Sequence, residues 1–427
     1  MEWTPVTHRG WVGAVAALGL TVTVGGCGVL GGDSDHVTLR LVAADYGDSA
    51  ANSSKVYWAN LVKAYEKEHP DVDVQVSVYS WNDVDREVKE MVDAGDAPDM
   101  AQIGSYADYA AKGLLYQASD LLSISTQADF VSQLANAGKV RGQQYGMPFA
   151  ASTRLLFYNK ALFSSAGIAE APTTWDELAA DAAKLKRAGV DYPYALPLGP
   201  EEAQAETMQW MLSGGGGYTS TAGTYSLDST ENVHTFTWLK DELVDKGLTG
   251  PVAPGKLNRA QAFSAFAAGD VGMLIGHPSL MKAARDKGVS YGMVPMPSKG
   301  GARTLTMGVA DWMTAFRRHG HRDEIGRFLD FVYDRDNVLT FSRTYDLLPV
   351  TSSASQVMST AAEDRELEPF LAQLPLSELY PVGRTSWASV AATVKQGIGA
   401  AVASGGNPAT VLRKLETDAM SADNAAS

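Results

Sequence analysis

Hydrophobic and polar positions follow two different periods along the chain. Apolar residues occupy every second position over residues 37–41 and 72–78, which is the period of a β-strand. The segment between these strands has the spacing of an amphipathic helix, with apolar residues at Trp58, Leu61, Val62 and Tyr65. His69-Pro70 ends this helix, because the residue before a proline disfavours helical angles. The strand, helix, strand order predicts a parallel sheet with right-handed crossovers.

Helical stripes recur in the rest of the chain. Thr174 and Glu177 have the spacing of a capping box, and an apolar stripe follows over residues 175–185. Similar stripes predict helices over residues 236–243, 325–332 and 387–401, the last being the final long helix. The chain is therefore expected to be α/β throughout.

The first residues predict a secretory signal. An apolar run over residues 11–24 is too short for a stable membrane span but fits the core of a signal peptide. It leads through two glycines to Cys27, the only cysteine, in an arrangement similar to a bacterial lipobox. We expect a lipoprotein signal peptide at 1–26, a lipid on Cys27, and a small polar tether at 27–36. An ordinary secretory peptide with an incidental cysteine is the alternative.

Charge and cysteine content narrow the possible partners. The formal net charge is −14 and the pI is about 5.0, which disfavours nucleic acid or an anionic lipid surface as a partner. A single cysteine excludes an internal disulfide, so the fold depends on its hydrophobic core.

Five segments together resemble the family 1 extracellular solute-binding proteins, relatives of the maltose-binding protein. In chain order they are Gly95-Asp96-Ala97-Pro98-Asp99, Tyr145-Gly146-Met147-Pro148-Phe149, Leu155-Leu156-Phe157-Tyr158-Asn159-Lys160, Pro172-Thr173-Thr174-Trp175-Asp176-Glu177-Leu178 and Phe266-Ala267-Ala268-Gly269-Asp270-Val271-Gly272-Met273. Each is weak alone, but their order and spacing cover nearly all of the mature chain.

The resemblance implies a type II periplasmic-binding-protein fold, in which two α/β lobes enclose a ligand cleft. With hinge crossings near residues 147–152, 304–308 and 347–350, the N-terminal lobe is expected at 37–148 and 307–346. The C-terminal lobe then takes 149–306 and 347–427. Closure is a hinge motion that the ligand favours by contacting both lobes.

It also implies a function. The protein is expected to be a monomeric lipoprotein on the extracytoplasmic face of the cell membrane. It would capture a sugar or short oligosaccharide and deliver it to the permease subunits of an ABC importer. Neither catalysis, a cofactor nor a metal is expected.

Sugar recognition needs planar polar groups for the hydroxyls and aromatic rings for the C–H faces. In the first lobe, the ends of the predicted strands provide four candidates, which are Asp45, Trp81, Ser105 and Tyr106. Packing of Trp81 against a helix is the alternative. The first crossing adds Ser152 and Arg154, whose guanidinium is suited to vicinal hydroxyls, to a carboxylate, or to locking the hinge through an aspartate.

In the second lobe, the resemblance places ligand contacts between residues 198 and 210, where Glu206 and Gln204 are the candidates. The alternative is that this acidic run only favours a helix N-terminus. His277 stands where relatives often carry a tryptophan, so the sequence departs from the family pattern there. A structural role is the alternative for His277.

The last candidates lie near the second crossing and at the start of the final predicted helix. Asp311 and Trp312 would provide a hydroxyl acceptor and a stacking face, unless Trp312 is a core residue. Arg384 and Trp387 open the helix, and Trp387 also belongs to its apolar stripe, so core packing is again the alternative.

Motifs for catalysis are missing from the sequence. It has no Gly-x-Ser-x-Gly elbow, no phosphate loop and no His-Glu-x-x-His pair. Two alternatives stay open. One is a secreted glycosidase that uses Asp45 and Glu206 as its carboxylates. The other keeps the fold but binds a metal ion, a peptide, or an amino sugar or polyamine held by the acidic run over residues 201–206.

Overall fold

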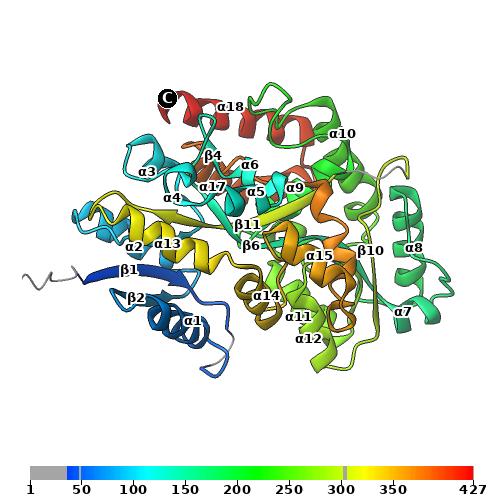
Figure 1. Cartoon of the computed structure of the whole chain (residues 1–427). Helices are drawn as coiled ribbons and strands as arrows, with labels where there is room; N and C mark the ends of the chain where they lie inside the picture. Colours follow the sequence, from blue (N-terminus) through cyan, green and yellow to red (C-terminus); the bar gives the residue numbers. More distant parts are fainter. Residues whose placement is uncertain (1–35, 48–49, 302–304, 427) are drawn as a thin grey trace, which may run out of the picture. The chain divides into compact units, whose positions relative to one another are not determined.

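The computed structural model (Figure 1) describes residues 36–47, 50–301 and 305–426. The predicted signal peptide, Cys27 and most of the tether lie outside the described residues, so those predictions stay predictions. The ordered chain begins with a strand at Val37, where the sequence pattern places the start of the folded body.

The larger sheet has the strand order β12-β11-β3-β1-β2, and β6 also pairs with β11. Its strands are β1 (Val37–Ala44), β2 (Val72–Tyr79), β3 (Met100–Ile103), β6 (Met147–Thr153), β11 (Thr306–Ala315) and β12 (Ser377–Glu378). β1 lies parallel to both β2 and β3, as the strand, helix, strand order predicts. β11 runs antiparallel to β3 and β6.

Different helices cover the two faces of this sheet. α1 (Ser54–Glu68) and α13 (Arg322–Val332) pack on one face, where Leu39 and Leu41 are buried. α2 (Val84–Asp93) and α3 (Ala107–Ala111) belong to the other, where Val42 and Ala44 are buried. Successive residues of β1 enter different cores because side chains alternate across a strand.

The second sheet has the order β10-β7-β9-β8. Its strands are β7 (Leu155–Asn159), β8 (Tyr192–Tyr194), β9 (Val271–Gly276) and β10 (Tyr291–Val294). α8 (Trp175–Arg187) packs on β8 and β9, and α11 (Arg259–Ala268) packs on β9. The predicted capping box is confirmed at the start of α8: Thr174 accepts from the Glu177 backbone, and the Glu177 side chain accepts from the Thr174 backbone.

The remaining elements surround the two sheets. The helices are α4 (Ala118–Leu121), α5 (Ile124–Asp129), α6 (Ser132–Ala137), α7 (Lys160–Ser165), α9 (Ala203–Ser213), α10 (Thr230–Trp238), α12 (Ser279–Asp286), α14 (Arg335–Thr344), α15 (Ser352–Thr360), α16 (Glu368–Leu371), α17 (Trp387–Gly397) and α18 (Pro408–Ala426). β4 (Lys139–Val140) and β5 (Gln143–Gln144) form a short hairpin.

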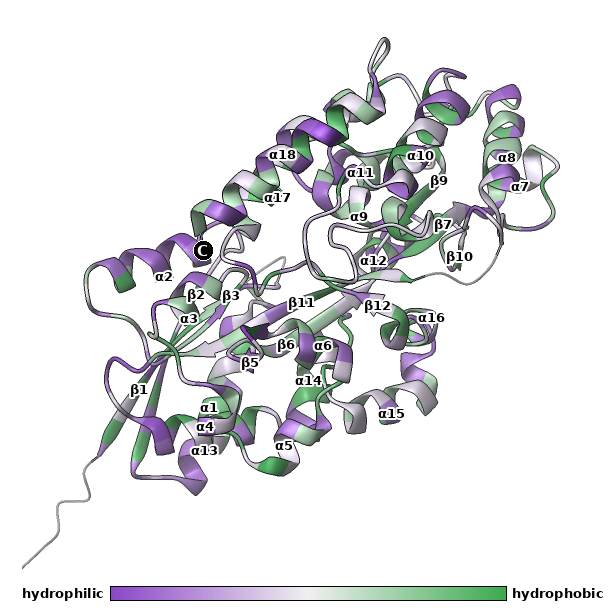
Figure 2. Ribbon diagram, turned by 90° about the horizontal axis from the view of Figure 1, so that it is seen from above, coloured by the Kyte–Doolittle hydropathy of each residue, from purple (hydrophilic) through white to green (hydrophobic). Residues whose placement is uncertain are grey.

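The three segments predicted to cross between lobes lie next to one another. Ser152 of β6 pairs with Val309 of β11, and Ala151 bridges to Leu348. Figure 2 shows β6 and β11 running from the region of β1 and β3 toward that of β7 and β9. Only Arg154 separates β6 in the first sheet from β7 in the second.

The predicted lobe boundary at residue 347 is not marked by a change of packing partners. α15 contacts α14, and the Ser353 backbone N–H donates to Asp129 Oδ1 (2.9 Å), so this helix stays with elements of the predicted first lobe. In contrast, α17 contacts α9, and α18 contacts both α10 and α17. The exact lobe limits remain a prediction.

The structure corrects one helix prediction and refines two. The helical stripe near Phe236 begins as α10 and continues as a π-helical turn, Leu239–Val244. α17 ends at Gly397 and continues as a 3-10 turn, Ile398–Ala401. The expectation that this is the final long helix is wrong, because the 19-residue helix α18 follows. Alanine and polar residues interrupt the apolar stripe of α18, which makes its helical pattern weak.

Within the described part of the chain, none of the helices has the length and apolar character that a membrane span requires.

Candidate functional site

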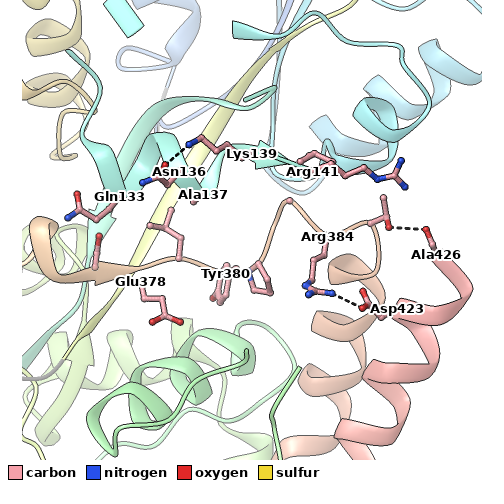
Figure 3. A pocket seen from close by; sticks show the side chains of 16 residues that line it. Gln133, Asn136, Ala137, Lys139, Arg141, Glu378, Tyr380, Arg384, Asp423 and Ala426 are labelled. Atoms are coloured by element: carbon pink, nitrogen blue, oxygen red, sulfur yellow. Dashed lines mark hydrogen bonds and ion pairs between the residues drawn. The ribbon is translucent and has the colours of Figure 1, made fainter. Parts of the chain in front are cut away.

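Residues 379–386 connect β12 to α17, and we call this segment the strap. It lines two cavities that also involve segments of the first sheet. The β3 cavity, about 210 Å³, lies between the strap with the start of α17 and the residues after β3, including Ser105 and Tyr106. The strap cavity, about 750 Å³, lies between the strap, residues 133–141 and the end of α18 (Figure 3). Arg384 lines both cavities.

Three aromatic side chains form a wall beside the strap. Tyr380 and Trp387 stack with ring centroids 5.0 Å apart and an interplanar angle of 28°. Tyr218 meets the Trp387 ring edge on, with centroids 5.0 Å apart. Trp387 lines the β3 cavity and Tyr380 lines the strap cavity. We call Tyr218, Tyr380 and Trp387 the aromatic wall.

The glycine run before Tyr218 explains how this ring is positioned. A Cβ on Gly214 would lie 2.1 Å from Thr235 Oγ1, and a Cβ on Gly216 would lie 2.1 Å from Asn232 Oδ1. The glycines therefore let the chain approach α10 closely, and Asn232 Nδ2 donates to the Gly217 carbonyl (2.8 Å). Tyr218 is then fixed at its far end, where its hydroxyl donates to the Gln204 carbonyl (2.9 Å).

The side-chain amide of Gln204 lies beside the aromatic wall, against the Tyr380 hydroxyl. Its oxygen is buried and accepts no hydrogen bond from the residues that the structure describes. Buried polar atoms in folded proteins nearly always have a partner, so this oxygen is a candidate acceptor for a ligand hydroxyl.

Charged residues form a network next to Gln204. The Arg154 side chain is 6% exposed, and its Nη2 lies 2.7 Å from Glu202 Oε1. Arg259 lies 2.5 Å from the other Glu202 oxygen through Nε, and 2.7 Å from Glu201 through Nη2. Arg154 is therefore paired with a carboxylate, but the partner is a glutamate of the predicted second lobe, so the predicted hinge lock through an aspartate stays a prediction.

His277 belongs to the edge of this network. Its Nε2 lies 3.4 Å from Arg259 Nη1, and Ser279 Oγ lies 2.9 Å from its Nδ1. Burial and the charges of Arg154 and Arg259 hold the pKa of His277 well below its usual value, so the ring is neutral at physiological pH. Its ring also packs against Phe263, with centroids 5.0 Å apart.

Glu206 is a buried acid on α9. Its Oε1 accepts from Trp210 Nε1 (3.0 Å) and from the Tyr194 hydroxyl (3.2 Å). Burial raises the pKa of Glu206 to about 8, although these hydrogen bonds and the Arg154 charge act in the opposite direction. The acidic run is thus internally neutralised, since Glu201 and Glu202 are ion-paired and Glu206 is largely protonated.

The first-lobe candidates at the ends of β1 and β2 have local partners. Asp45 accepts from the Ser54 backbone N–H (2.8 Å), the Ser53 hydroxyl (2.8 Å) and the Gly47 backbone N–H (3.1 Å). Burial would raise its pKa, but these hydrogen bonds lower it below the usual value. Trp81 is half-buried and meets the Tyr46 ring edge on, with centroids 5.5 Å apart.

The crossing candidates divide between surface and core. Ser152 and Asp311 are half-buried, and burial raises the pKa of Asp311 to about 8. Trp312 is 1% exposed and packs against Tyr106, with centroids 5.6 Å apart. This burial favours the packing interpretation of Trp312 over stacking on a ligand. Tyr106 is also 1% exposed, and its hydroxyl donates to the Ala137 carbonyl (3.1 Å).

The structure therefore brings only part of the predicted site together. Four candidates line the β3 cavity, namely Ser105, Tyr106, Arg384 and Trp387. Arg154 and Glu206 line a much smaller pocket beside Glu202 and Arg259. Tyr218 and Tyr380 were not predicted as site residues. The position of Tyr218 directly after four glycines was the available signal, whereas the only sequence candidate within the strap was Arg384.

Metal binding finds no support among residues 36–47, 50–301 and 305–426, where no group of three or more His, Cys, Asp or Glu side chains is arranged to hold an ion.

Comparison with known proteins agrees with this description. A relative from Brucella abortus (strain 2308), described as a binding protein, is 27% identical over 390 residues, 90% of this chain and 93% of the relative. The diacetylchitobiose binding protein DasA of Streptomyces coelicolor is 29% identical over 178 residues, 40% of this chain and 41% of the relative. The solved structure of the cyclic alpha-maltosyl-1,6-maltose binding protein from Arthrobacter globiformis matches with a TM-score of 0.77 at 21% identity, covering 90% of this chain and 98% of that one.

The structural match confirms the predicted type II, two-lobed α/β fold. The sequence profile described as "Bacterial extracellular solute-binding protein" matches residues 50–338, which is more than half of the chain. The chain therefore belongs to the bacterial extracellular solute-binding protein family.

Proposed function

We propose that this protein captures a sugar or short oligosaccharide between its two lobes and delivers it to an ABC importer. The observation that carries the proposal is the aromatic wall with the unpartnered Gln204 oxygen beside it. Stacked rings suit the C–H face of a pyranose, and a buried acceptor suits one of its hydroxyls. The names of relatives support the same substrate class, since one binds diacetylchitobiose and a structural neighbour binds a cyclic maltosyl sugar.

The charges of the site favour a neutral sugar over a polyamine or a cationic amino sugar. A cage for an amine needs free carboxylates. Here Glu201 and Glu202 are paired with Arg259 and Arg154, and burial keeps Glu206 largely protonated. An uncharged N-acetylated amino sugar remains compatible with this environment.

Binding without turnover is part of the proposal. Asp45 holds the start of α1 through its hydrogen bonds from Ser53 and Ser54, and Glu206 is buried beneath Tyr194 and Trp210. These roles leave the two acids of the glycosidase alternative occupied within the fold. Chromogenic glycosides should therefore give no product with the full chain, and hydrolysis above background would support the glycosidase.

Closure and anchoring complete the proposal. The lobes, with the limits predicted from the sequence, would close about the adjoining crossings at Ala151, Ser152, Val309 and Leu348. A lipid on Cys27 would hold the monomer at the extracytoplasmic face of the membrane, near its permease. A Cys27→Ala variant should leave the membrane fraction after a salt wash and remain folded, whereas a variant that stays membrane-bound contradicts the anchor.

The test of sugar capture is a binding screen with a site variant. The melting temperature of the full chain should rise when at least one sugar is added from a panel of chito-oligosaccharides, malto-oligosaccharides and alditols. It should not rise when spermidine is added. Calorimetric titration of Trp387→Ala with that sugar should show at least roughly tenfold weaker binding, or about 1.4 kcal/mol. Stabilisation by spermidine alone would reject the sugar assignment.

A further inference from the structure

Asp423, in the last turn of α18, accepts hydrogen bonds from the segment that leads into α17. Arg384 Nη1 and the Ser386 hydroxyl both donate to Asp423, at 2.6 Å each and to different carboxylate oxygens. Figure 3 shows Arg384 and Asp423 facing each other beside the strap cavity. Thr385 adds a hydrogen bond to the Ala426 carbonyl (3.3 Å). The end of α18 therefore holds the strap at the point where the strap leads into α17.

The residues that Asp423 holds are also tied to the second lobe. Ser386 is 2% exposed, and its hydroxyl lies 3.0 Å from the Tyr225 hydroxyl. Arg384 stands over the Tyr225 ring, 5.2 Å from its centroid, and donates to the Gly223 carbonyl. This cluster directly precedes Trp387, whose backbone N–H donates to the Arg384 carbonyl (3.1 Å).

The place of Asp423 in α18 is unfavourable for the helix itself. A negative charge in the last turn opposes the helix dipole and costs some helix stability. An isolated surface ion pair with Arg384 would offset little of this cost. The additional hydrogen bond from buried Ser386 makes the arrangement stronger than such a pair. Burial raises the pKa of Asp423, but its bonds to Ser386 and Arg384 more than reverse this and keep the carboxylate ionised.

Apolar packing holds only part of the strap on its other side. Leu379 and Val382 contact the core beneath the first sheet. Glu378, Tyr380 and Arg384 instead border the strap cavity of about 750 Å³. A side chain that faces a cavity lacks dispersion contacts there, so polar contacts must restrict its position.

We propose that Asp423 is a positioning residue of the binding site, which holds the strap through Arg384 and Ser386 and thereby sets the orientation of Tyr380 and Trp387. This inference rests on the proposed function, because it assumes that the aromatic wall contacts the ligand. It assigns to the C-terminal helix a role in affinity that acts through the position of the strap.

Hydrogen exchange of the full chain tests the positioning itself and needs no ligand. In Asp423→Asn, amides of residues 379–390 should exchange at least roughly fivefold faster than in the parent. The matched control is Asp418→Asn in the same helix, which removes an ion pair with Lys414 (2.6 Å) away from the strap. Exchange of 379–390 in Asp423→Asn within about twofold of the parent would overturn the proposal.

Affinity separates this inference from the proposed function. With diacetylchitobiose and maltose as probes, Asp423→Asn should weaken binding at least roughly threefold, while Asp418→Asn should not, because disorder of the strap must be removed on binding. If Trp387→Ala weakens binding and Asp423→Asn does not, the positioning role fails and the binding site stands. If neither variant changes the affinity for a probe that the parent binds, the site assignment fails as well.

Discussion

Tyr380 of the strap and Trp387, the first residue of α17, stack with their ring centroids 5.0 Å apart. The two residues have different surroundings, since Tyr380 is half-buried and borders the strap cavity, whereas Trp387 is 7% exposed and borders the β3 cavity. The stack thus joins a more accessible ring to one that is anchored in the second lobe's core. Tyr380 is the member whose removal should separate ligand contact from stability.

A Tyr380→Ala substitution should weaken sugar binding at least roughly tenfold, equivalent to about 1.4 kcal/mol, because it removes one ring of the proposed stacking surface. Tyr380→Phe is the matched control, since it keeps the ring and removes only the hydroxyl beside Gln204. Calorimetric titration measures both. Equal affinities for the parent and Tyr380→Ala would exclude this ring from the site.

Trp312→Ala should act on stability. The Trp312 ring is 1% exposed and packs against Tyr106, so its loss should reduce the free energy of unfolding by about 3–5 kcal/mol. Chemical denaturation measures this change, and titration of the folded variant should show nearly unchanged sugar affinity. A variant with the parent's stability and weak binding would instead establish Trp312 as a ligand contact.

The contrast between Trp312 and Trp387 shows which features of the fold and the site can be predicted from the sequence. Alternation and helical spacing predicted β1, α1, β2 and the capping box of α8, because these depend on local periodicity and on neighbours in the chain. Burial of an aromatic residue depends on distant partners. Trp312 meets Tyr106 of the β3 end, and no local pattern distinguishes that contact from an open cleft.

Tyr380 of the strap was missed for the same physical reason. Tyr380 lies in an irregular segment without periodicity, and its neighbours Gln204 and Tyr218 come from distant parts of the chain. Arg154 illustrates an intermediate case. Its position at the first crossing predicted a polar lock, but only the fold identifies Glu202 as the partner. The resemblance to the family predicted a cleft between two lobes, whereas the side-chain contacts within it could be identified only from the structure.

The Arg154 and Glu202 pair should be energetically coupled. Glu202 contacts both Arg154 and Arg259, so Glu202→Gln leaves two buried or half-buried cations without their shared carboxylate. In a double-mutant cycle with Arg154→Met, the coupling free energy should be on the order of 1–3 kcal/mol. Urea denaturation of the parent, both single variants and the double variant gives this value. Additive losses would show that the pair contributes no specific interaction.

Glu206 should make stability depend on pH. Its pKa rises from 4.5 in the reference state to about 8 in the folded protein, so the folded state binds a proton that the unfolded chain releases. The resulting stabilisation is complete below about pH 4.5 and is lost as the pH rises toward about 8.

Glu206→Gln resembles the protonated acid and keeps an oxygen that accepts from Tyr194 and Trp210. Its stability relative to the parent should therefore increase with pH between about 5 and 8, by up to roughly 1.4 kcal/mol per pH unit. Asp311 titrates in both proteins, so its contribution cancels in the difference. Denaturation curves measured at pH 5, 6, 7 and 8 provide the comparison, with Glu242→Gln as an exposed control, since Glu242 pairs with Lys246 at the surface. Parallel stability profiles for the parent and Glu206→Gln would mean that Glu206 is ionised in the folded protein.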